Sequence, residues 1–181
     1  MDRIRRISLF GGPGCGKSST KSFLVNQLKK HGINVSEVDE WVKEWAYMKV
    51  DISGFDQLFV FANQLRKEEL KLKNGEDFIV TDSPVFLPVY YSTKYGFDDW
   101  KNLAEISKSF DRQYPSLNIF LNRDGVKYRE IGRWENEEEA NVVDRDLQNL
   151  MDDHGIEYVT LKTVDEDEIL NYMLENINGK S

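Results

Sequence analysis

Short apolar runs alternate along the chain with longer segments in which apolar residues recur every three or four positions. The runs predict buried strands over residues 7–10, 33–38, 78–81, 117–121 and 156–161. The periodic segments predict helices over residues 17–31, 39–47, 55–73, 98–114, 136–153 and 165–176, with an aromatic and partly helical stretch at 85–95. Strands that are apolar throughout and alternate with helices are typical of a parallel sheet covered on both faces. The pattern therefore predicts an α/β fold, a three-layer sandwich around a five-stranded parallel sheet.

The first predicted strand leads into Gly11-Gly12-Pro13-Gly14-Cys15-Gly16-Lys17-Ser18, which fits the phosphate-binding pattern G-x-x-x-x-G-K-[ST]. Its position between a strand and a helix is the context in which this pattern forms a P-loop. Glycines let backbone N–H groups point at phosphate oxygens, and the following helix adds its positive dipole end. We expect Lys17 to reach the β- and γ-phosphates of a nucleotide and to be catalytic. The expected nucleotide-binding residues are Gly12, Pro13, Gly14, Cys15, Gly16, Lys17, Ser18 and Ser19.

Charged residues follow the predicted strands at the edge of the sheet where ligands bind in parallel α/β folds. Asp82 ends the strand at 78–81, which matches the Walker-B pattern of an apolar strand that delivers one carboxylate. We expect Asp82 and the hydroxyl of Ser18 to hold Mg²⁺, and a turn cap before Pro84 is the structural alternative for Asp82. The expected cofactors are ATP or GTP and Mg²⁺.

Residues after two other strands are candidates for the acceptor side of the site. Glu40 can accept a proton from an attacking hydroxyl or orient that hydroxyl, and Asp39 is the alternative for this role. Trp41 can stack on an aromatic ring of the acceptor, with packing on the sheet as the alternative. Arg123 follows the fourth predicted strand and is expected to contact the substrate from the same edge.

The segment at about 123–135 is polar, rich in arginine and lysine, and without periodicity. Such a segment predicts a lid that closes over a transferring phosphoryl group and shields it from water. An arginine on the lid can stabilise the negative charge that develops on the phosphoryl oxygens. Arg129 and Arg133 are the preferred pair for this catalytic role, and at least two of the basic residues of the segment are expected to be solvated only.

Composition and charge narrow the range of partners. The chain has 181 residues, a formal net charge of −8 at pH 7 and a single cysteine, Cys15. The negative charge argues against a broad nucleic-acid surface, no apolar stretch reaches membrane-spanning length, and one cysteine permits no internal disulfide. We therefore expect a cytoplasmic protein with one P-loop kinase-like domain over residues 1–181, whose partner is a small nucleoside- or nucleotide-like molecule rather than a nucleic acid or a membrane.

Several of these segments resemble a known group of kinases. The P-loop together with Glu40-Trp41-Val42-Lys43-Glu44-Trp45 resembles the ribosylnicotinamide kinase domain of bifunctional NAD-biosynthesis proteins. Thr81-Asp82-Ser83 resembles the Thr-Asp pair of that domain, and Gly132-Arg133 resembles its lid arginine. AAA-like ATP-binding proteins of tailed bacteriophages are a second resemblance. Ser83-Pro84 departs from the kinase pattern at a place where an acceptor could bind.

The resemblance implies ATP at the P-loop, Mg²⁺ at Ser18 and Asp82, the acceptor at Glu40, and adenine near Lys162 and Thr163. The expected function is transfer of the γ-phosphoryl group of ATP to a small nucleoside- or nucleotide-like acceptor. Two alternatives stay open. A kinase of polynucleotide ends or modified DNA bases would label an oligonucleotide, whereas a non-catalytic nucleotide-binding switch or regulatory module would bind nucleotide and transfer no phosphate.

Overall fold

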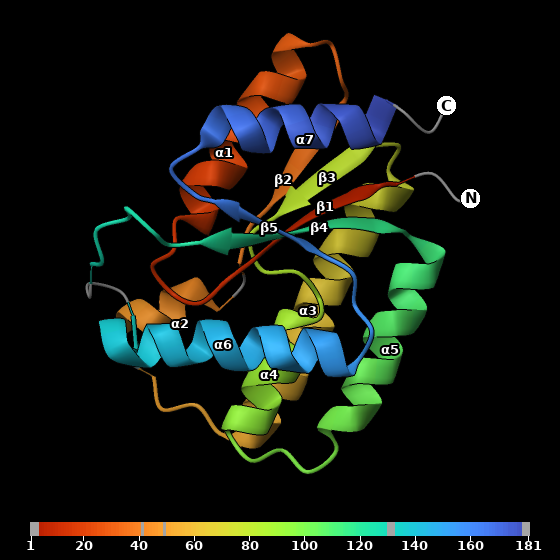
Figure 1. Ribbon diagram of the computed structural model, residues 1–181. Helices are drawn as coiled ribbons and strands as arrows, with labels where there is room; N and C mark the ends of the chain where they lie inside the picture. Colours follow the sequence, from red (N-terminus) through yellow and green to blue (C-terminus); the bar gives the residue numbers. More distant parts are fainter. Residues whose placement is uncertain (1–3, 41, 49, 130–132, 179–181) are drawn as a thin grey trace.

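The core of the protein is a five-stranded sheet in which every strand pair is parallel (Figure 1). The computed structural model describes residues 4–40, 42–48, 50–129 and 133–178. The strands lie in the order β2-β3-β1-β4-β5. Their bounds are β1 (Arg6–Phe10), β2 (Val35–Val38), β3 (Phe78–Thr81), β4 (Ser116–Asn122) and β5 (Val159–Lys162). The predicted five-stranded parallel sheet is confirmed.

Helices cover both faces of this sheet. Within the described residues they are α1 (Lys17–Lys30), α2 (Lys43–Met48), α3 (Gly54–Lys73), α4 (Leu87–Lys94), α5 (Trp100–Gln113), α6 (Glu137–Asp153) and α7 (Glu166–Asn178). Figure 1 shows α1 and α7 on one face and α3, α4, α5 and α6 on the other. The three-layer arrangement is therefore also confirmed. A search of the described residues finds no helix with the length and apolar character needed to cross a membrane.

Both faces of β1 are buried, although the strand contains the polar residues Arg6 and Ser8. Ile7 and Leu9 are fully buried in a cluster that includes Leu24 of α1 and Met173 of α7. Phe10 lies in a second cluster, formed with residues of α3, α4, α5 and α6. Arg6 and Ser8 alternate with Ile7 and Leu9, and they are buried with partners, Arg6 with Glu68 at 3.2 Å and Ser8 with Ser116 at 2.7 Å.

Two strands begin later than the hydrophobic pattern predicts, and for the same reason. Residues 33 and 156 were predicted strand residues, but each follows a glycine that ends a helix. The backbone N–H of Ile33 donates to the carbonyl of Leu28 at 3.0 Å, and that of Ile156 donates to the carbonyl of Met151 at 2.9 Å. These are the bonds of a helix C-terminal cap, in which an apolar residue after the glycine packs back on the helix. The residues therefore complete α1 and α6, and the strands start at Val35 and Val159.

Candidate functional site

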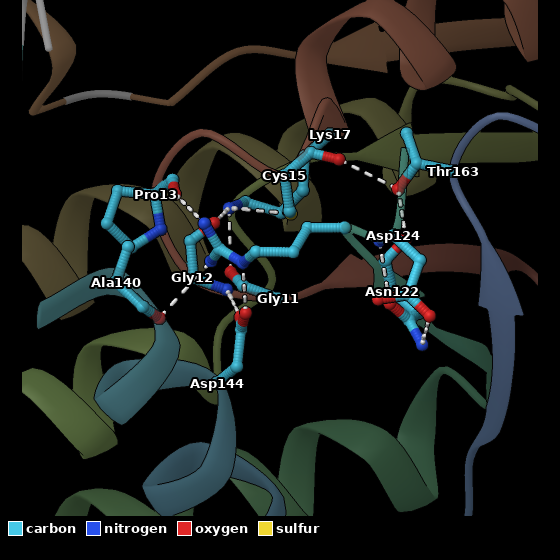
Figure 2. Close-up of polar contacts among 11 residues, drawn as sticks. Gly11, Gly12, Pro13, Cys15, Lys17, Asn122, Asp124, Ala140, Asp144 and Thr163 are labelled. Carbon is cyan, nitrogen blue, oxygen red and sulfur yellow. Dashed lines mark hydrogen bonds and ion pairs between the residues drawn. The ribbon is translucent and has the colours of Figure 1, made fainter. Parts of the chain in front are cut away.

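The segment from Gly11 to Ser18 connects β1 to α1 and forms a closed turn of backbone. Gly14 and Gly16 have φ angles of 79° and 96°, in the left-handed region that side chains disfavour. The ammonium of Lys17 donates to the carbonyls of Gly11 and Gly12, each at 2.7 Å (Figure 2). A positive charge is thus fixed against the inside of the loop, at the N-terminus of α1, where an anion is favoured.

The two predicted Mg²⁺ ligands are in direct contact. Ser18 Oγ donates to Asp82 Oδ2 at 2.6 Å. The described residues contain no group of three or more His, Cys, Asp or Glu side chains that could hold a metal. A hydroxyl and one carboxylate, completed by phosphate oxygens and water, nevertheless form the oxygen-rich set that Mg²⁺ uses in phosphoryl-transfer sites. The residues present therefore fit this ion.

A buried lysine that the sequence analysis did not single out also contacts Asp82. The ammonium of Lys21 lies 3.0 Å from Asp82 Oδ1 and 2.6 Å from Asp39 Oδ1. Burial on its own would lower the pKa of Lys21, but the hydrogen bond to Asp39 and the charge of Asp82 outweigh it and raise this pKa. Lys21 therefore stays charged and links the ends of β2 and β3. The sequence signal that could have identified Lys21 is its position, one helical turn after Lys17 on the same helix.

Arg123 braces the phosphate loop against α6. Its Nε lies 2.5 Å from Asp144 Oδ2, and its terminal nitrogens donate to the carbonyls of Pro13 at 3.1 Å and Ala140 at 3.2 Å. Asp144 in turn accepts a hydrogen bond from the backbone N–H of Gly12 (Figure 2). The guanidinium of Arg123 thus contacts the phosphate loop and α6. None of these distances tests its predicted contact with the substrate, which stays a prediction.

Thr163 supports the same loop from the end of β5. Its buried hydroxyl lies 2.8 Å from the carbonyl oxygen of Cys15 and 3.0 Å from that of Asn122 (Figure 2). A Cβ added at Gly16 would lie 2.5 Å from Thr163 Cγ2, so only glycine allows this close approach. Thr163 thus lies against the loop, and its predicted contact with adenine is not tested by these distances.

Part of the predicted lid segment lies over the phosphate loop. A Cβ added at Gly14 would lie 2.4 Å from the ring of Tyr128, so the two residues are in contact. The guanidinium of Arg133 lies 5.7 Å from the centre of the same ring. The Nε of Arg133 is buried and has no hydrogen-bond partner among the described residues. Arg129, its predicted companion, is exposed.

The segment also reaches across to the connection between α2 and α3. The Tyr128 hydroxyl donates to the carbonyl of Glu135 at 2.6 Å, and the Trp134 indole donates to the carbonyl of Val50 at 3.2 Å. The carboxylate of Glu135 is buried and pairs with Lys94 of α4 at 2.5 Å. These contacts place residues 133–135 against α4 and the α2–α3 connection.

A cavity of about 210 Å³ joins the phosphate loop to this region. The predicted residues that line it are Pro13, Gly14, Gly16, Lys17, Ser18, Ser19, Glu40, Asp82 and Arg133. Its lining does not include the described residues Gly12, Cys15, Asp39, Arg123, Arg129 and Thr163. Trp41 was predicted to stack on the acceptor and lies outside the described residues. The structure thus brings the expected phosphate, metal and proton-accepting groups to one space.

The far end of the cavity is aromatic and was not predicted. Tyr47, Tyr91, Tyr95 and Trp134 line it, together with the polar residues Gln57 and Glu135. The rings of Tyr91 and Tyr95 are stacked, with centroids 6.2 Å apart. Burial, followed by the charges of Glu135 and Glu40, raises the pKa of Tyr91 well above its usual value, and burial also raises that of Tyr95 to about 12. Both hydroxyls are therefore neutral at physiological pH.

Comparisons with known proteins agree with this geometry. The family model AAA_28, described as an AAA domain, matches residues 6–168. A crystal structure of NadR protein in complex with NR superposes with a TM-score of 0.71 at 13% identity, covering 97% of this chain and 52% of that chain. A second structure of NadR protein, in complex with NAD and AMP-PNP, gives a TM-score of 0.68 at 14% identity, covering 98% and 51%.

The chain thus spans about half the length of the NadR chains that it matches. A comparison with curated protein sequences gives no match. At 13% and 14% identity the structural likeness establishes the fold, a P-loop NTPase fold of the kind found in NadR. Because the family model covers most of the sequence, this chain belongs to the AAA_28 family of AAA domains.

Proposed function

We propose that this protein transfers the γ-phosphoryl group of ATP to a hydroxyl of a small nucleoside-like acceptor. One observation carries the proposal: Lys17, Asp82 and Glu40 line a single cavity whose other end is aromatic. A phosphate site and a site for a planar ring in the same space are what such a transfer requires. The NadR structures, whose complexes contain NR or NAD with AMP-PNP, support a nucleotide and a nucleoside-like ligand.

In the proposed reaction an acceptor oxygen forms a bond to the γ-phosphorus while the bond to the β-phosphate oxygen breaks, and ADP leaves. Glu40 receives the proton of the attacking hydroxyl. Lys17 and Arg133 stabilise the negative charge on the phosphoryl oxygens, and the lid segment excludes water from them. Ser18 and Asp82 would hold Mg²⁺, which when bound neutralises charge on the β- and γ-phosphates.

The test is a transfer assay with labelled Mg-ATP and a panel of nucleosides, nucleoside monophosphates, ribosylnicotinamide and a 5′-hydroxyl oligonucleotide. The proposal predicts label on at least one nucleoside-like acceptor and none on the oligonucleotide. Label on the oligonucleotide alone would identify a polynucleotide kinase. Nucleotide binding with no labelled product would identify a switch or regulatory module, and either result rejects the proposal.

Glu40→Gln tests the proton acceptor within this scheme. We expect the variant to keep its stabilisation by ATP in a thermal-shift assay and to lose about 10²- to 10⁴-fold in kcat, because only the proton transfer is affected. Glu37→Gln, which changes an exposed carboxylate on β2 just before Glu40, is the matched control and should behave like the original chain. Unchanged turnover in Glu40→Gln would assign the proton acceptor to another residue.

A further inference from the structure

The inner face of α3 carries three buried polar residues, Gln57, Gln64 and Glu68. Two of them have partners inside the protein. Gln64 donates to Glu68 at 3.3 Å and to the Thr81 hydroxyl at 3.2 Å, and Glu68 pairs with Arg6 at 3.2 Å. Gln57 is only 4% exposed, and its side-chain amide forms no hydrogen bond with any residue that the structure describes. Its oxygen and nitrogen are not among the fully buried, unpartnered polar atoms of these residues. It lines the cavity instead.

The surroundings of Gln57 make this amide unusual. Val60, one turn further along α3, is 4% exposed and lines the same cavity, as do Ile52 and Leu87. An amide that faces a cavity among apolar side chains can exchange water for a ligand, and it favours a ligand that replaces the hydrogen bonds it gives up. An amide also has a fixed shape, with one acceptor oxygen beside two N–H donors. A ligand that offers the complementary pair would satisfy it.

The rest of the cavity limits which ligand that can be. Four aromatic side chains line it, which suits a planar ring. Glu40 and Glu135 contribute carboxylates to this part of the lining, and Lys94 already pairs with Glu135. The cations of the lining, Lys17 and Arg133, lie instead at the phosphate loop. An additional anionic group on the ring would therefore be repelled at this end. The pocket favours a neutral or cationic ring over an acidic one.

We propose that Gln57 determines acceptor specificity by pairing, through both its oxygen and its nitrogen, with a ring edge that carries a donor next to an acceptor. Two sources share this chemistry: a carboxamide attached to the ring, and the hydrogen-bonding edge of a nucleobase. The inference rests on the proposed function, since it names the class of acceptor for the same cavity. It adds that the acceptor is a nucleoside whose ring is neutral or cationic and bears such an edge.

The test measures binding of matched nucleosides by calorimetry, with AMP-PNP and Mg²⁺ present. Adenosine is compared with purine riboside, cytidine with the riboside of 2-pyrimidinone, and ribosylnicotinamide with its carboxylic acid analogue. We expect the original chain to bind the edge-bearing member of at least one pair about 10- to 100-fold more tightly. A preference in the first two pairs assigns a nucleobase, and a preference confined to the third assigns a carboxamide.

Gln57→Leu should abolish that preference while leaving the affinity for AMP-PNP unchanged. Its melting temperature without ligand should stay close to that of the original chain, because leucine has a similar size and the substitution removes no hydrogen bond to a residue that the structure describes. This separates loss of recognition from loss of folding. Gln113→Leu, an exposed glutamine at the end of α5, is the control and should retain the preference.

Three results would overturn the inference: equal binding within every pair, no binding of any nucleoside, or a preference that persists in Gln57→Leu. The outcome for the proposed function is read separately, from phosphoryl transfer. Selective binding that depends on Gln57 without any transfer would reject the kinase proposal alone. Transfer with the same selectivity in Gln57→Leu would reject the role of Gln57 alone.

Discussion

The two ends of the cavity are built in different ways. The nucleotide end is one continuous segment, Gly11 to Ser18, held by contacts to its own backbone and by Arg123, Asp144 and Thr163. The acceptor end is assembled from single residues of α2, α3, α4 and the lid segment. A continuous phosphate loop can be recognised from local sequence, whereas an assembled pocket depends on packing between distant elements. Because the two ends are built from different elements, we expect a mutation at one end to leave ligand binding at the other end unchanged.

The largest expected effect is that of Lys17→Ala on the nucleotide end. The ammonium that neutralises the phosphates is lost, so we expect affinity for ATP to fall by on the order of 100-fold or more. Stabilisation by Mg-ATP in a thermal-shift assay should disappear. Nucleoside binding at the acceptor end should persist in calorimetry without nucleotide. Lys29→Ala, an exposed lysine of the same helix, is the control, and an unchanged ATP shift in Lys17→Ala would contradict the assignment.

A smaller effect is expected when the contacts of Asp144 with Arg123 and with the phosphate loop are removed. Asp144→Ala removes the carboxylate that pairs with Arg123 and accepts from the N–H of Gly12, which should lower the free energy of unfolding by about 1–3 kcal/mol. ATP affinity should fall by roughly tenfold as the loop loses support, with acceptor affinity unchanged. Asp146→Ala, which removes a partly exposed carboxylate on the same helix, is the control. Equal losses at both ends would show that the two are coupled.

The smallest effect concerns the packing behind the acceptor end. Burial, and next the charge of Asp146, raises the pKa of Tyr90 to about 12, whereas a tyrosine in the unfolded chain titrates near 10. Between these values the unfolded chain releases a proton that the folded one retains, so this contribution to stability falls as pH rises from about 10 to 12.

Tyr90→Phe should therefore flatten the alkaline decline in stability, measured by urea unfolding at several pH values across that interval. Binding of ATP at neutral pH should not change. Tyr47→Phe, which alters a 60% exposed tyrosine, is the control and should leave the decline intact. A decline of the same steepness in Tyr90→Phe would show that other groups cause it.

Features that depend on residues close together in the sequence could be predicted. The parallel sheet follows from apolar runs that alternate with helices. The predicted start of a helix at residue 136 is confirmed by a capping box, in which Asn136 and Glu139 exchange hydrogen bonds at 2.8 and 2.9 Å. The contact between Ser18 and Asp82 was likewise expected, because each follows from a local pattern at the carboxyl edge of the sheet.

Features that depend on distant partners could not be predicted. Arg123 was expected to face a substrate, but carbonyl groups of Pro13 and Ala140 lie within reach of it only after β1, β4 and α6 have packed. Gln57 and Glu135 are polar residues whose burial is decided by the fold. The apolar spacing of α3 gave no signal for Gln57, because Phe55, Leu58 and Phe59, which follow that spacing, are exposed, whereas Gln57 is buried.

The bond between the Trp134 indole and the Val50 carbonyl has a kinetic consequence. The segment that contains Tyr128 and Arg133 lies over the phosphate loop, and the adjoining Trp134 and Glu135 form part of the acceptor wall. The lid segment therefore lies over both the phosphate loop and the acceptor end of the cavity. We therefore expect ADP and the phosphorylated product to depart during the same opening event, so that the turnover rate is set by how often the Trp134–Val50 and Glu135–Lys94 contacts break together.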